Sequence, residues 1–181
     1  MKRLERGILL VMALAACRSS EPSRNGRLQA RWTGADTGQF SALAAAEWCD
    51  DQRRLEIRAI KGDTGLAVAV FPEVVLSPDT YRVVAAGSKD SNPPSARVGL
   101  RWFGTTAING FQGDSGTVVL ERTDSGQLAG HLAARVRSVS NSDRVTVTGE
   151  FENLAVTPQS RGCIADSAVE SAQSGDTDRV D

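Results

Sequence analysis

Hydrophobic and polar residues alternate along most of the chain between residues 27 and 156, a pattern typical of β-strands with one buried face. In the first such segment Leu28, Ala30 and Trp32 share one face, and Arg27 and Arg31 lie on the other. The same period recurs in residues 54–59, 66–70 and 96–102. Each of these segments is predicted as a strand, and residues 54–59 and 66–70 are predicted to form a hairpin around the glycine-bearing loop 61–65.

The clearest alternation runs from residue 117 to residue 156. Two turn sequences, Asp124-Ser125-Gly126 and Asn141-Ser142-Asp143, divide it into three segments, and turns favour these residue types. The pattern predicts a meander of three antiparallel strands with one face in water. The outward positions are polar: Arg135, Arg137, Arg144, Thr146, Thr148 and Glu150.

Three stretches are less regular. The alanine-rich run 42–48 alternates as a strand does, although its propensity also fits a short helix, and we expect a strand. Residues 81–85 form a short strand candidate. Residues 104–116 are rich in glycine and threonine, and they have no assignment beyond a short strand near Ile108.

Many short strands without a convincing amphipathic helix predict an all-β domain, either an antiparallel β-sandwich or a small β-barrel. A resemblance rests on two sequences, Leu-Ala-Gly-His-Leu at 128–132 and Val-Thr-Val-Thr-Gly-Glu-Phe at 145–151. The order of residues in them is similar to that in many uncharacterised secreted β-domains of bacteria. The resemblance implies this class of fold and no particular activity.

The start of the chain has the pattern of an export signal. Lys2, Arg3 and Arg6 precede an apolar run, residues 7–16, that is too short to span a bilayer. The run ends in Leu14-Ala15-Ala16-Cys17, which resembles the lipobox of bacterial lipoproteins. The resemblance implies that Cys17 becomes the acylated mature N-terminus, and two or three acyl chains hold a protein stably on a membrane.

The position after the lipobox cysteine influences sorting in that family. Arg18, a residue other than aspartate, is expected to favour the outer membrane over the inner one. The alternative is ordinary signal-peptidase cleavage, which would leave a free thiol on Cys17 in an oxidising compartment.

These patterns divide the chain into four parts. Residues 1–16 are the expected signal peptide, residues 17–26 a lipidated N-terminus and polar linker, and residues 27–163 the β-domain. Residues 164–181 are acidic and nearly free of apolar side chains, so we expect a disordered tail. The formal net charge of −1 for the whole chain argues against a general nucleic-acid binder.

The chain contains three cysteines, and lipidation of Cys17 leaves the pair Cys49 and Cys163. In an exported protein such a pair is expected to form a disulfide, here one that fastens the end of the domain to its beginning. Closing a loop of that length is worth about 4 to 5 kcal/mol in the chain-entropy model. A metal site is not expected, because the chain has no CxxC motif and His131 is its one histidine.

Two motifs resemble those of proteases. Gln112-Gly113-Asp114-Ser115-Gly116 looks like the nucleophile loop of trypsin-like serine proteases, but His131 follows the serine, against that family's chain order. Asp36-Thr37-Gly38 and Asp63-Thr64-Gly65 match the triplet of aspartic proteases, but they lie too close in sequence for two lobes. We expect a glycine-rich turn at the first motif and hairpin loops at the other two.

The sequence therefore favours a non-enzymatic lipoprotein of the cell envelope that binds an envelope protein or glycan and needs no cofactor. A second hypothesis is a carrier of small hydrophobic ligands. Its barrel cavity would be lined by Trp32, Trp48 or Trp102, all on inferred apolar faces, and small residues would leave the space. These are Ala42, Ala44, Gly130 and Ala134. A third hypothesis is a hydrolase that uses Asp36, Asp63 or Ser115.

Overall fold

The computed structural model describes residues 26–88 and 92–158, and these form ten β-strands and no helix. The strands are β1 (Gly26–Gly34), β2 (Gly38–Cys49), β3 (Arg54–Lys61), β4 (Thr64–Phe71), β5 (Asp79–Val83), β6 (Ser95–Phe103), β7 (Ile108–Arg122), β8 (Leu128–Ser138), β9 (Arg144–Leu154) and β10 (Val156–Pro158). The prediction of an all-β domain is confirmed. No helix long and apolar enough to cross a bilayer occurs among these residues.

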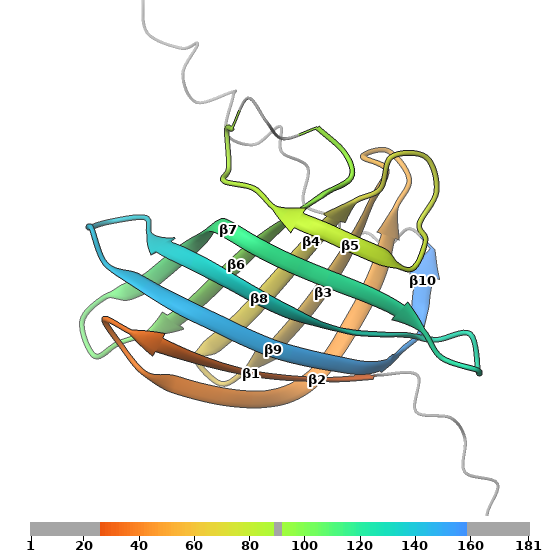
Figure 1. Ribbon diagram of the computed structural model, residues 1–181. Helices are drawn as coiled ribbons and strands as arrows, with labels where there is room; N and C mark the ends of the chain where they lie inside the picture. The colour runs from red at the N-terminus through yellow and green to blue at the C-terminus, as the bar shows by residue number, and fades with distance from the viewer. Residues whose placement is uncertain (1–25, 89–91, 159–181) are drawn as a thin grey trace, which may run out of the picture.

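The sheet closes on itself into a barrel (Figure 1). The first strand provides the closure, because β1 pairs with β2 along one edge and with β9 along the other. Around the barrel the order is β2, β3, β4, β6, β7, β8 and β9, with β1 between the last and the first. Of the two predicted architectures the barrel is therefore right and the sandwich is wrong, since these strands do not separate into two sheets.

Strand β5 inserts between β6 and β7 at one end of the barrel, where it runs parallel to β6 and antiparallel to β7. The first part of β7 pairs with β6, and its second part pairs with β5. A β-bulge between Gly113 and Ser115 marks the change. The motif at residues 112–116 is thus a bulge inside a long strand, and the predicted glycine-rich turn is wrong there.

Most of the remaining predictions of strands are confirmed. Residues 54–70 form the β3–β4 hairpin, and residues 117–154 form the meander of β7, β8 and β9. The alanine-rich run lies in β2, where Ala42, Ala44 and Ala46 are buried and the strand is paired on both sides. Tertiary pairing therefore outweighs the helix propensity of alanine.

Large side chains fill the space that small residues leave inside the barrel. A Cβ atom added to Gly130 would lie 2.8 Å from the Phe151 ring, and one added to Gly38 would lie 2.2 Å from the Trp32 ring. Trp32 and Trp102 stack with ring centroids 5.3 Å apart, and Phe111 stacks on Trp102 at 4.9 Å. The interior is therefore a packed core, in which small and large residues interdigitate.

Strand β10 leaves the end of β9 and runs parallel to β2, with Pro158 opposite Trp48. The neighbouring residue Cys49 ends β2 and is 2% exposed. The predicted signal peptide, the lipidation site Cys17, its linker up to residue 25, Cys163 and the acidic tail lie outside the described residues.

Candidate binding groove on the outer face of the barrel

The outward positions of β3, β4 and β6 lie in rows that the strand register defines. One row joins Arg58, Ala67 and Gly99. The next row joins Glu56, Ala69 and Arg97, so small side chains occupy the middle of both rows. Because outward residues alternate along each strand, these two rows form one continuous patch about 7 Å wide along the strands.

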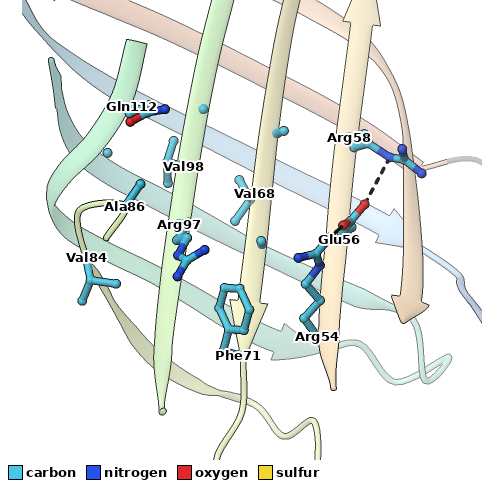
Figure 2. Close-up of a pocket in the computed structure, with 14 residues that line it drawn as sticks. Arg54, Glu56, Arg58, Val68, Phe71, Val84, Ala86, Arg97, Val98 and Gln112 are labelled. Carbon is cyan, nitrogen blue, oxygen red and sulfur yellow. Dashed lines mark ion pairs between the residues drawn. The ribbon is translucent and has the colours of Figure 1, made fainter. Parts of the chain in front are cut away.

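This patch is the floor of a cavity of about 280 Å³, which we call the outer groove. The chain that follows β5 forms one wall, because the amide of Val84 donates a hydrogen bond to the Ala96 carbonyl (2.9 Å) and holds that segment beside β6. Figure 2 shows Val84 and Ala86 on that side and the charged residues of β3 on the other. The groove is lined by Arg54, Glu56, Arg58, Ala67, Val68, Ala69, Phe71, Val84, Ala86, Arg97, Val98, Gly99, Gln112 and Gly113.

The wall formed by β3 carries charged residues that are unusually buried for the outside of a barrel. Arg54 is 5% exposed and Glu56 is 7% exposed, and their side chains form an ion pair. Arg58 forms an ion pair with Glu47 on β2, and its Nε lies 3.8 Å from the Glu56 carboxylate. Charges removed from water in this way are stable when they are paired, so this wall is a fixed, pre-arranged feature.

Arg97 differs from these two arginines. Its guanidinium carbon lies 5.1 Å from the centroid of the Phe71 ring, a cation–π contact (Figure 2). The Nε atom is buried and has no hydrogen-bond partner. Among the ion pairs of the described residues none involves Arg97. The groove therefore contains one positive charge that is held in place but is not neutralised by a carboxylate.

The middle of the floor is open. A Cβ atom added to Gly99 would meet no atom within 4 Å, and Ala67 on the neighbouring strand is exposed. Small residues at these outward positions leave a flat surface between the β3 charges and the Val84 wall. A ligand with a flat apolar body fits this surface better than a bulky or highly polar one.

The protease-like motifs do not assemble into a catalytic site. Ser115 lies opposite Arg135 and His131 opposite Val119 on the paired strands β7 and β8. These positions are four residues apart in register, about 13 Å along the strand, which is too far for a hydrogen bond between serine and histidine. His131 is exposed on the outer face, as its place in the sequence pattern predicted.

The two aspartate triplets lie where the sequence predicted them, at hairpin loops. The Asp36 carboxylate accepts a hydrogen bond from the Thr37 amide (2.7 Å) in the β1–β2 turn. Asp63 lies in the β3–β4 turn, where its carbonyl accepts a hydrogen bond from the Phe103 amide (3.2 Å). Both aspartates therefore have structural roles in turns.

The tryptophans lie in or against the core. Trp32 is 6% exposed, and Trp48 and Trp102 pack against the buried cluster. The Trp48 Nε1 donates a hydrogen bond to the Asp50 carboxylate (2.6 Å). In the described part of the chain no three metal-ligating side chains come together.

The sequence pattern placed Arg54, Glu56, Arg58 and Arg97 opposite the apolar residues of their strands, but it did not identify the groove as a site. One signal was present. Outward positions in 67–71 and 97–99 include alanine, phenylalanine and glycine, where a solvated face has charged or polar residues. Comparisons with family models, with curated proteins and with solved structures found no match to this chain.

Proposed function

We propose that this protein is a lipid-anchored, non-enzymatic binding module of the bacterial cell envelope, and that the outer groove is its binding surface. The observation that carries the proposal is a cavity of about 280 Å³ on the outside of a barrel whose interior is packed. A groove with a flat floor, a fixed charged wall and one unneutralised arginine has the features of a recognition surface. Its partner is a component of the envelope, either a protein or a glycan.

The test of this surface is site-specific photo-crosslinking in intact cells that express the full chain. A photoreactive amino acid replaces Ala86, an exposed residue in the wall of the groove, and a matched variant carries it at Thr148, an exposed position of β9. We expect a discrete adduct from position 86 and none from position 148. Equal labelling at both positions, or labelling at position 148 alone, would contradict the assignment of the groove.

The anchor is proposed from Cys17 and the apolar run before it. The described domain begins at Gly26, so eight residues lie between the proposed lipidated cysteine and the barrel, a short tether by the reach of an extended chain. The substitution Cys17→Ser is expected to release the protein from membranes, because no acyl chain then remains. Fractionation of cells expressing each form measures this, and membrane retention of the variant would overturn the anchor. Separation of inner from outer membranes tests the expected outer-membrane location.

We also propose the disulfide between Cys49 and Cys163. The register of β10 supports it, since Pro158 lies beside Trp48 and Cys49 is the next residue of β2. Five residues span at most about 17 Å, which is enough for residue 163 to reach Cys49. The mass of the unreduced protein tests the bond, which removes two hydrogens. Substitution Cys163→Ser is expected to lower the free energy of unfolding by about 4 kcal/mol.

A carrier of small hydrophobic ligands is the second candidate. The closed barrel supports it, as does the buried Nε1 of Trp32, which has no hydrogen-bond partner. Native mass spectrometry of the Cys17→Ser protein, compared with the same protein carrying Gly99→Phe, separates the two candidates. A bound molecule that survives Gly99→Phe lies inside the barrel and favours the carrier, whereas one lost with that substitution lies in the outer groove.

A further inference from the structure

The charges of the outer groove leave one site for an anion. Glu47 and Glu56 are both engaged by arginines, the first by Arg58 and the second by Arg54. Arg97 stands apart, and its guanidinium rests on Phe71 with the buried Nε lacking an acceptor. An acidic oxygen that approached the guanidinium of Arg97 would form a charge-assisted hydrogen bond with it.

The surface beside Arg97 is apolar and flat. Arg97 and Gly99 are two residues apart on β6, so their outward positions are separated by about 7 Å. Ala69 is opposite Arg97 and Ala67 is opposite Gly99, which extends the flat surface onto β4. Phe71 and Val84 border it, and the space above Gly99 is open. An acid held at Arg97 would therefore place an attached apolar body over Gly99 and Ala67.

From these two features we propose that the outer groove binds a small organic anion, in which one acidic group contacts Arg97 and a flat apolar body covers Ala67, Ala69 and Gly99. This inference rests on the proposed function, because it concerns the same groove, and it adds a small-molecule ligand to the protein or glycan partner proposed above. The volume of about 280 Å³ is close to the lower end of small-molecule sites, roughly 300 to 1,000 Å³. Phe71 contacts the guanidinium of Arg97, and arginine binds carboxylates through the N–H groups of its planar guanidinium.

Two dyes that share one ring system test the proposal on the Cys17→Ser protein without detergent. Anilinonaphthalene sulfonate carries an acidic group, and phenylnaphthylamine has the same rings without it. Fluorescence titration is expected to show a single site for the sulfonate and at least tenfold weaker binding of the neutral dye. Arg97→Gln should weaken the sulfonate about tenfold or more, as expected for one charge-assisted hydrogen bond, and leave the neutral dye unchanged.

Matched variants locate the site. Gly99→Phe fills the floor and is expected to abolish sulfonate binding, while Thr148→Phe on β9 leaves it unchanged. Arg101→Gln is the charge control, because Arg101 is exposed on β6 and does not line the groove. It is expected to change the dissociation constant less than twofold. Circular dichroism and the urea midpoint show that each variant is folded.

Three results would overturn the proposal. The first is sulfonate binding that Arg97→Gln and Arg101→Gln weaken equally, which would mean general charge attraction. The second is equal affinity for both dyes, which would mean an apolar site. The third is no binding of either dye to the unmodified groove. In that third case crosslinking from position 86 still decides the proposed function on its own, so failure of the ligand class and failure of the binding surface remain distinguishable.

Discussion

Two outer faces of the same barrel differ in what their outward positions contain. On β8, β9 and β1 most outward residues are charged or polar and exposed, among them Arg31, Arg135, Thr146 and Glu150, although β8 also has Ala133 there. On β3, β4 and β6 the outward residues include alanine, glycine and phenylalanine, and the charges of β3 are held in ion pairs. Both faces consist of antiparallel strands, and the groove face has in addition the wall formed by the chain after β5.

The two faces differ in how their charged side chains are stabilised. Water stabilises the polar face, because each charged side chain there is solvated. The outer groove and the neighbouring Glu47 instead keep two arginines and two glutamates in fixed positions at a cost in desolvation. A structural role in the core does not explain that cost, since the packed interior lies on the other side of the same strands. The ligand recognition proposed above would explain it.

The largest expected difference between the faces comes from removing one carboxylate. Glu56→Gln withdraws the partner of the buried Arg54 and one neighbour of Arg58, which keeps Glu47. We expect a loss of about 3 kcal/mol in the free energy of unfolding, the low end for breaking a buried ion pair. Urea denaturation of the two proteins measures it.

The control is Glu150→Gln on β9, where the carboxylate is exposed. A surface change of this kind is expected to stay within about 0.5 kcal/mol. Equal effects of the two substitutions would mean that the groove charges are solvated like those of the polar face.

A second, smaller difference lies between the barrel interior, where Gly130 faces Phe151, and the outer groove, and it comes from adding one methyl group. A Cβ atom at Gly130 on β8 would lie 2.0 Å from the Val119 carbonyl oxygen, so Gly130→Ala is expected to cost about 1 to 3 kcal/mol by overpacking. At Gly99 the same atom meets open space, and Gly99→Ala is expected to be neutral or to stabilise by up to about 1 kcal/mol. Thermal unfolding of both variants gives the comparison. A large loss at Gly99 would show that its floor position is not open.

The smallest expected effect is the coupling between Arg97 and Phe71. A double-mutant cycle with Arg97→Gln and Phe71→Leu should give a coupling energy of about 0.5 to 1 kcal/mol, typical of a partly exposed cation–π pair. The comparison cycle uses Arg135→Gln and Thr146→Val, two residues that are opposite each other on β8 and β9. Its coupling is expected to be near zero. Equal coupling energies in the two cycles would mean that Phe71 holds Arg97 no more strongly than an ordinary surface pair is held.

Much of the strand pattern could be predicted from the sequence, because alternation is a local property that a buried face imposes on every strand. The meander of β7, β8 and β9 and the hairpin at 54–70 followed from it directly. The failure at residues 112–116 has a physical reason. A bulge uses the same glycine, aspartate and serine that a turn uses, and the partner strands that distinguish the two are distant in sequence.

Even less of the groove than of the strand pattern could be predicted from the sequence. Outward residues of three strands form it, and the register that aligns Arg58 with Ala67 and Gly99 is set by pairings along the whole sheet. One of its walls is formed by the segment that follows β5. Strand β5 itself inserts between β6 and β7, and no local sequence signal indicates that insertion. The candidate residues that the sequence did suggest were short motifs, and the structure places Ser115 and His131 apart.

The sequence by itself determined the periodic elements of this protein, the inward and outward identity of most residues, and a signal and lipobox pattern at its start. These properties depend on neighbours within a few residues, so a linear pattern carries them. The tertiary structure alone decided that the sheet closes through β1, that large side chains fill the barrel, and that Arg97 lies unneutralised beside a flat outer floor. Those properties depend on which strands pair and in what register, and such long-range pairings leave no periodic trace in the chain.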